Sequence, residues 1–256
     1  KGDKDGLTKL LSDLPDYVCL VFVYDLIEYK PDARTKLAAA IKAHGMAVKF
    51  TRQEQGDLVD WIRRRFKALD HDIDSELARY LIFLCGDLMT GLISEIGKIG
   101  AYAQHRAVTR ADIDAVAIPQ LDAVVFQLTD AIAAGDFDKA SSVLSDLLHM
   151  GEPPIKLLSV LGRQLRQLYS ARLAIEKGKG APYVAGLWGL KPYPADKLMT
   201  SARRFSLSWC RRAVVRCGQT DLAMKSTGQD AQELLTGLLL ELAAPSRPAG
   251  RQGARG

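Results

Sequence analysis

Few side chains in this sequence have the type and spacing that catalysis requires. It contains no G-x-x-x-x-G-K-[ST] phosphate loop, H-E-x-x-H motif or G-x-S-x-G motif, and the four histidines stand far apart: His44, His71, His105 and His149. Asp25 and Glu28 follow an apolar run, a position where nucleotide-binding proteins can hold Mg²⁺. Because no phosphate loop accompanies them, we interpret both as solvent-exposed loop acids. The sequence therefore predicts no catalytic, cofactor-binding or metal-binding residue.

The four cysteines do not form the pattern of a zinc site or a disulfide framework. They are Cys19, Cys85, Cys210 and Cys217, and no two of them make a C-x-x-C pair. Only the last two could share one face of a helix, and no histidine lies near them at ligand spacing. We expect reduced, mostly buried thiols in a cytoplasmic protein.

Arginines gather on the expected outer faces of several helices, with few acids between them in the sequence. These arginines are Arg163, Arg166, Arg172, Arg203, Arg204, Arg211, Arg212 and Arg216. Together with a net charge of +5 and a pI near 9.0, they indicate either solvated faces or contacts with acidic subunits or DNA phosphates. No aromatic platform accompanies them, so base stacking is not expected. Our candidate contact residues are Lys30, Arg34, Arg163, Arg166, Arg211 and Arg212.

The first fifty residues are predicted to combine helices with strands. Leu7–Leu14 and Asp32–Ala43 have helical patterns, whereas Val18–Tyr24 is a continuous apolar run typical of a strand buried on both faces of a parallel sheet. Met46–Phe50 is predicted as a second strand. Two strands cannot bury both faces of a sheet, and the chain begins at Lys1 rather than Met. We therefore expect further strands, and an N-terminal portion, upstream.

From Gln53 onward the pattern is helical. Residues 51–118 are predicted to form a small helical domain, which a capping-box-like start at Thr109–Asp112 closes with Asp in place of Glu. Residues 119–244 are predicted to form a helical bundle, with the Gly/Pro-rich stretch Gly178–Pro194 as a connection. The tail 245–256 is rich in Gly, Pro and Arg and is expected to be disordered. The expected class is mostly α, with a partial α/β domain at residues 1–50.

Several short stretches, in this order, resemble one protein family, the delta subunit of the bacterial DNA polymerase III clamp loader. They are Leu20–Tyr24 with Lys30–Leu37, Leu58–Ile62, Gly86–Leu88 with Glu95–Ile99, Val108–Ile113, Val125–Ala131, Gly151–Pro154, Gln164–Arg166 and Asp221–Lys225. The resemblance extends over Leu20–Leu242. It implies an AAA+-like domain without a nucleotide-binding loop, followed by a helical lid and a helical collar.

The same resemblance implies a function in replication. The family's delta subunit binds and opens the ring-shaped sliding clamp for loading onto primed DNA, and its collar assembles the loader as a five-subunit ring. The resemblance thus implies a non-catalytic, cytoplasmic subunit of the DNA-directed DNA polymerase (nucleotidyltransferase) holoenzyme, without cofactor or membrane contact and with weak or indirect contact to DNA. The family's clamp-gripping Leu-Phe pair is not present in Lys1–Tyr17, so we assign no clamp-binding residues.

Three other interpretations remain open at this point. A helical adaptor without a replication role would leave the expected strand–helix–strand unit unexplained. An AAA+ ATPase whose phosphate loop lies upstream would use Asp25 as a metal ligand, and nucleotide binding would favour it. A general DNA-binding protein is suggested by the pI alone, and a steep salt dependence of binding would favour it.

Overall fold

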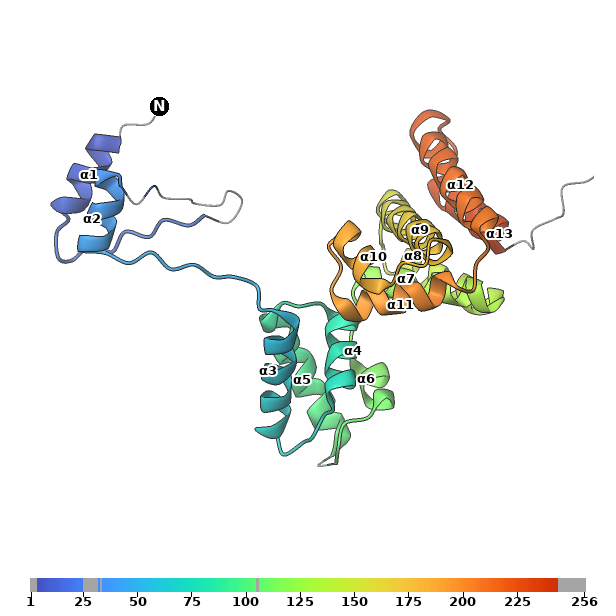
Figure 1. Ribbon diagram of the computed structural model, residues 1–256, viewed down its shortest axis with the longest axis horizontal. Coiled ribbons are helices and arrows are strands. Elements are labelled where there is room, and N and C mark those ends of the chain that lie inside the picture. The colour runs from blue at the N-terminus through green and yellow to red at the C-terminus, as the bar shows by residue number, and fades with distance from the viewer. Residues whose placement is uncertain (1–3, 25–31, 33, 105, 244–256) are drawn as a thin grey trace, which may run out of the picture. The chain divides into compact units, whose positions relative to one another are not determined.

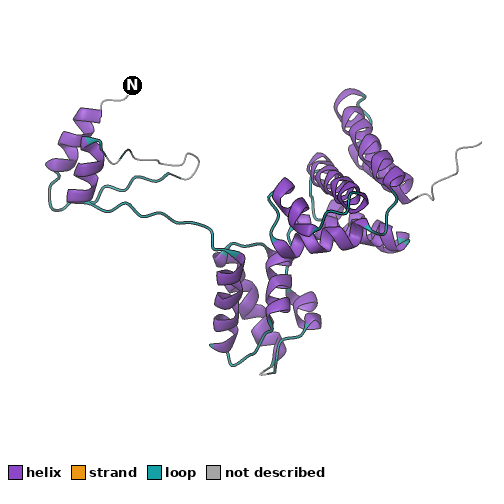
Figure 2. Cartoon of the chain, viewed as in Figure 1, coloured by secondary structure: helices purple, strands orange, loops and turns teal. Residues whose placement is uncertain are grey.

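The computed structural model describes residues 4–24, 32, 34–104 and 106–243. Within these ranges the protein has thirteen helices and no strand, which confirms the mostly α class (Figures 1 and 2). The chain divides into two compact units, Lys1–Arg52 and Gln53–Gly256. The acids Asp25 and Glu28 and the tail 245–256 lie outside the described residues.

The N-terminal unit contains two packed helices, α1 (Lys4–Ser12) and α2 (Lys36–His44). Both strand predictions in this unit are wrong for this structure: Val18–Tyr24 and Met46–Phe50 are loops without ladder hydrogen bonds (Figure 2). A strand exists only when a neighbouring strand satisfies its N–H and C=O groups, and no described segment does so here. Their apolar side chains are consequently exposed, up to 94% at Phe50.

Four helices with their own hydrophobic core begin the second unit: α3 (Gln55–Lys67), α4 (Ser75–Cys85), α5 (Met89–Ala103) and α6 (Arg110–Val116). The i, i+4 spacing of Leu58, Ile62 and Phe66 places all three on the inner face of α3, where they are fully buried. The same core includes side chains from α4, α5 and α6.

The start of α6 is held by a capping box, as predicted. Thr109 accepts a hydrogen bond from the Asp112 N–H, and the Asp112 carboxylate accepts from the Thr109 N–H at 2.8 Å. Arg106 adds two bonds from its guanidinium, at 2.6 and 2.5 Å, to a carboxylate that is only 3% exposed. These hydrogen bonds, from Arg106 first and then Thr109, hold the pKa of Asp112 well below its usual range, although burial opposes them.

Replacing Asp112 with Asn should lower the free energy of unfolding at pH 7 by about 2 kcal/mol, because hydrogen bonds to a buried charge are lost. A group whose folded pKa is lowered contributes stability above its ordinary pKa of about 4, and this stability is lost as the pH falls. The difference between wild type and Asp112→Asn should therefore be constant from pH 7 to 5 and shrink below about pH 4. Urea denaturation at several pH values measures it. A difference that grows at low pH would contradict the assignment.

Seven helices around a second core complete the unit. They are α7 (Leu121–Ala134), α8 (Phe137–His149), α9 (Pro154–Glu176), α10 (Ala181–Trp188), α11 (Pro192–Ala202), α12 (Leu207–Ser226) and α13 (Ala231–Ala243). The long helix α9 is central and packs against α7, α10, α11, α12 and α13. The prediction of a plain connection at Gly178–Pro194 is wrong: α10 forms there because Val184 is fully buried in this core.

The two cores meet where α4 packs against α7. The Phe83 ring of α4 packs edge-on against Phe126 at 5.3 Å between centroids and lies 5.8 Å from the Tyr193 ring of α11. Just before α7, the Gln120 N–H donates to the carbonyl of Leu84 in the last turn of α4, at 2.8 Å. These contacts join the helices of the first core directly to the bundle.

Candidate functional site

The two candidate contact residues of the N-terminal unit are Lys30 and Arg34. Lys30 lies outside the described residues. Arg34 is almost fully exposed and pairs with Asp32, with 3.1 Å between Nε and Oδ1. An exposed ion pair of this kind contributes little to stability. Arg34 is therefore accessible to a partner, but the structure does not set it in a site.

Arg163 and Arg166 on α9 do not form one free basic face. The Arg163 guanidinium pairs with Asp122 at the start of α7. Arg166 points toward α12, since a Cβ built on Gly162 would lie 3.3 Å from its Nη1 and 3.0 Å from the Cys217 Sγ. Arg163 thus forms an exposed ion pair between two helices, whereas Arg166 is exposed and lies beside α12.

The α12 arginines differ in the same way. Arg216 makes two hydrogen bonds to Glu241 of α13, at 2.5 and 2.6 Å, in the paired geometry that guanidinium and carboxylate favour. Arg212 is half-buried, whereas Arg211 is exposed and makes no ion pair with any described acid. An acid that seemed to be missing from the sequence thus comes from another helix at Arg216, whereas Arg211 is exposed and makes no ion pair with a described acid.

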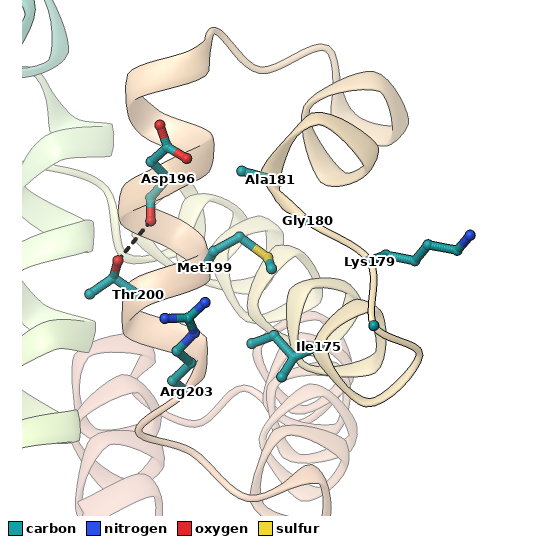
Figure 3. Close-up of a pocket in the computed structure, with 9 residues that line it drawn as sticks. Ile175, Lys179, Gly180, Ala181, Asp196, Met199, Thr200 and Arg203 are labelled. Atoms are coloured by element: carbon teal, nitrogen blue, oxygen red, sulfur yellow. Dashed lines mark hydrogen bonds between the residues drawn. The ribbon is translucent and has the colours of Figure 1, made fainter.

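A cavity of about 510 Å³ lies between the end of α9, the loop before α10, and α11 (Figure 3). Met199 lies at its centre, with Asp196 and Arg203 of the same helix at either end, while the Lys179 side chain points away (Figure 3). The Thr200 hydroxyl donates to the backbone carbonyl of Asp196 at 3.0 Å and is therefore occupied. The arrangement contains neither a nucleophile with a base nor a pair of facing carboxylates.

Three of the four cysteines are partly or fully buried, whereas Cys19 is exposed. Burial raises the pKa of Cys85 to about 12 and that of Cys210 and Cys217 to about 11, although Arg166 opposes the shift at Cys217. These thiols are protonated at neutral pH and are poor nucleophiles. Among the described residues no group of three His, Cys, Asp or Glu side chains could hold a metal ion.

In the described part of the chain, no single helix is long and apolar enough to cross a membrane, whereas two bent pairs, α4 with α5 and α6 with α7, meet the length and composition criteria together.

The bundle that carries these arginines is also the part of the chain that matches a protein-family model. Residues 122–242 match the model of the DNA polymerase III delta subunit, C-terminal domain. The DNA polymerase III subunit delta of Bacillus subtilis (strain 168) is 26% identical over 245 residues, which cover 93% of this chain and 71% of that protein. This chain is therefore similar to DNA polymerase III delta subunits. The resemblance inferred from the sequence is confirmed.

Two further comparisons agree with this similarity. The probable DNA polymerase III subunit delta of Aquifex aeolicus (strain VF5) is 25% identical over 182 residues, 70% of this chain and 51% of that protein. The solved structure of the Bacillus subtilis DNA clamp loader delta protein matches with a TM-score of 0.61 at 25% identity, covering 94% of this chain and 71% of that one. The fold of nearly the whole chain is thus that of a delta protein.

One feature of α12 was not predicted from the sequence. Val215 and Leu222 on α12 are exposed, at 51% and 66%, although both are large and apolar. Their spacing of seven residues places them on one side of the helix, opposite the buried Cys210 and Cys217. This spacing is visible in the sequence, but only packing shows which side of α12 faces the core.

Proposed function

We propose that this chain is a non-catalytic subunit of the DNA polymerase III clamp loader that takes part in binding and opening the sliding clamp for loading onto primed DNA. The observation that carries the proposal is the structural match to a DNA clamp loader delta protein over 94% of the chain. The family match of residues 122–242 supports it independently. In this role the protein acts in the cytoplasm as part of the polymerase holoenzyme.

We assign residues 51–118 to a lid domain and residues 119–244 to a collar that contacts other loader subunits. Two separate hydrophobic cores support this division, one among α3–α6 and one among α7–α13. Residues 1–50 are assigned to an AAA+-like domain by family resemblance. In this arrangement the protein contributes binding surfaces, whereas related loader subunits supply ATP hydrolysis.

A binding experiment with two separate partners tests the proposal. The tagged chain is immobilised and offered the ATPase subunit of the clamp loader or the sliding clamp, both from the same organism. We expect retention of the ATPase subunit through the collar and only weak retention of the clamp, because Lys1–Tyr17 carries no Leu-Phe pair. An empty matrix and an unrelated helical protein serve as controls. Retention of neither partner would reject the clamp-loader role and favour the helical-adaptor interpretation.

A further inference from the structure

The side of α12 that faces away from α9 has a regular composition. Arg211, Val215, Gly218 and Leu222 recur at i, i+4, i+7 and i+11, so they share one side of the helix. We call these four residues the α12 outer face. All four are exposed, whereas Trp209, Cys210, Ala213 and Cys217 on the other side are buried in the bundle core.

The apolar part of the α12 outer face has the layout of a helix-packing seam. Val215 and Leu222 stand seven residues apart, about 10 Å along the helix, and are 51% and 66% exposed. Gly218 lies between them, and a Cβ built on it meets no atom within 4 Å. Glycine inside a helix is unfavourable relative to alanine, and no contact with a described residue requires it here. The seam thus has two apolar projections with a gap between them into which another helix fits closely.

The positive charge of Arg211, at one end of this seam, indicates which charge the partner carries. Arg211 makes no ion pair with a described acid. Its neighbours are already paired, Arg216 with Glu241 and Lys225 with Asp221. The unmatched charge on the α12 outer face is therefore positive, and a carboxylate is its natural complement.

We propose that the α12 outer face binds a helix of a neighbouring clamp-loader subunit. That helix packs apolar side chains against Val215 and Leu222, passes close to Gly218 and places an Asp or Glu at Arg211. Burial of the two exposed apolar side chains favours the complex, and the ion pair sets its register. The inference rests on the proposed function, because it names the surface through which the collar contacts another subunit.

The decisive variant is the double substitution Val215→Glu with Leu222→Glu, which introduces charge where the chain itself makes few contacts. Isothermal titration against the ATPase loader subunit should show a Kd at least about 10-fold higher than that of wild type. Met150→Glu is the matched control, because Met150 is 79% exposed in the turn between α8 and α9, and its Kd should stay within about 2-fold of wild type. Circular dichroism verifies that each variant is folded. If the double Glu variant is unfolded, Val215→Ser with Leu222→Ser replaces it.

Two single variants separate the other features of the face. Arg211→Glu should weaken binding about 5-fold or more and flatten its salt dependence. Gly218→Leu should raise the melting temperature of the free chain, since leucine favours the helix, yet weaken the complex by filling the gap. A variant that is more stable but binds less tightly cannot act through misfolding.

The outcomes distinguish this inference from the proposed function. If wild type binds the ATPase subunit and the double variant binds equally well, the α12 outer face is not the contact, and the clamp-loader role survives. If wild type binds no loader subunit, the proposed function fails, and the inference fails with it. If sedimentation shows that wild type self-associates and the double variant does not, while loader binding is unchanged, a second copy of the chain occupies the face and the inference is overturned.

Discussion

Replacing Trp209 with alanine should lower the free energy of unfolding by about 3–5 kcal/mol. Trp209 is buried between α12 and α13, and its ring stacks on Phe205 with 4.0 Å between centroids. Its indole N–H donates to the Leu242 carbonyl at 3.1 Å, near the end of α13. Alanine would leave a large cavity and an unpaired carbonyl. Urea denaturation followed by circular dichroism measures the loss without relying on tryptophan fluorescence.

Trp209→Phe provides the matched control for this result. Phenylalanine retains most of the aromatic packing against Phe205 and loses the hydrogen bond to Leu242, so the loss should be about 1–2 kcal/mol. Because Trp209 holds α13 against α12, the alanine variant should also weaken loader binding. A Trp209→Ala variant within about 1 kcal/mol of wild type would mean that the ring is not packed as described.

Gly86→Ala should destabilise the protein by about 2–3 kcal/mol, chiefly through backbone strain. Gly86 has φ 86° and ψ −178°, a backbone conformation that is essentially restricted to glycine. A Cβ at this position would also meet the amide end of the exposed Gln120 side chain, which can move away at little cost. Thermal and urea unfolding of the purified variant measure the loss.

The double variant Gly86→Ala with Gln120→Ala separates backbone strain from the contact with Gln120. It removes the contact but leaves the strain, so the loss caused by Gly86→Ala should be nearly the same when measured relative to Gln120→Ala alone. Gly189→Asn is a second control, because Gly189 has φ 64° and ψ 30°, in the left-handed region that Asn tolerates, and its loss should be below about 1 kcal/mol. Equal losses at Gly86 and Gly189 would contradict the assigned backbone geometry.

Structural features that depend only on residues close together in the sequence could be predicted from it. The inner face of α3 follows from the 3.6-residue period, and its residues Leu58, Ile62 and Phe66 are buried as expected. The capping box at Thr109 and Asp112 was equally visible, because all its atoms lie within three residues of each other. The family resemblance arose from such local motifs taken in order, and the comparisons confirmed it.

Strand pairing and ion pairs between residues far apart in the sequence could not be predicted from it. The apolar run Val18–Tyr24 has strand composition, yet no described segment offers it a hydrogen-bonding neighbour, and it is a loop. Arg163 and Arg216 seemed free of acids, but Asp122 and Glu241 lie 41 and 25 residues away and are brought to them by helix packing. A partner at that separation cannot be inferred from charge pattern alone.

By itself, the sequence determined the mostly α class, the order of the principal helices and the family resemblance, because helix periodicity and capping are local. The tertiary structure alone decided which arginines form ion pairs with distant acids and that α10 forms around Val184. It also decided that Val215 and Leu222 lie on the exposed side of α12. The physical reason is that burial and ion pairing are set by the packing of whole helices on one another, which joins residues far apart in the chain.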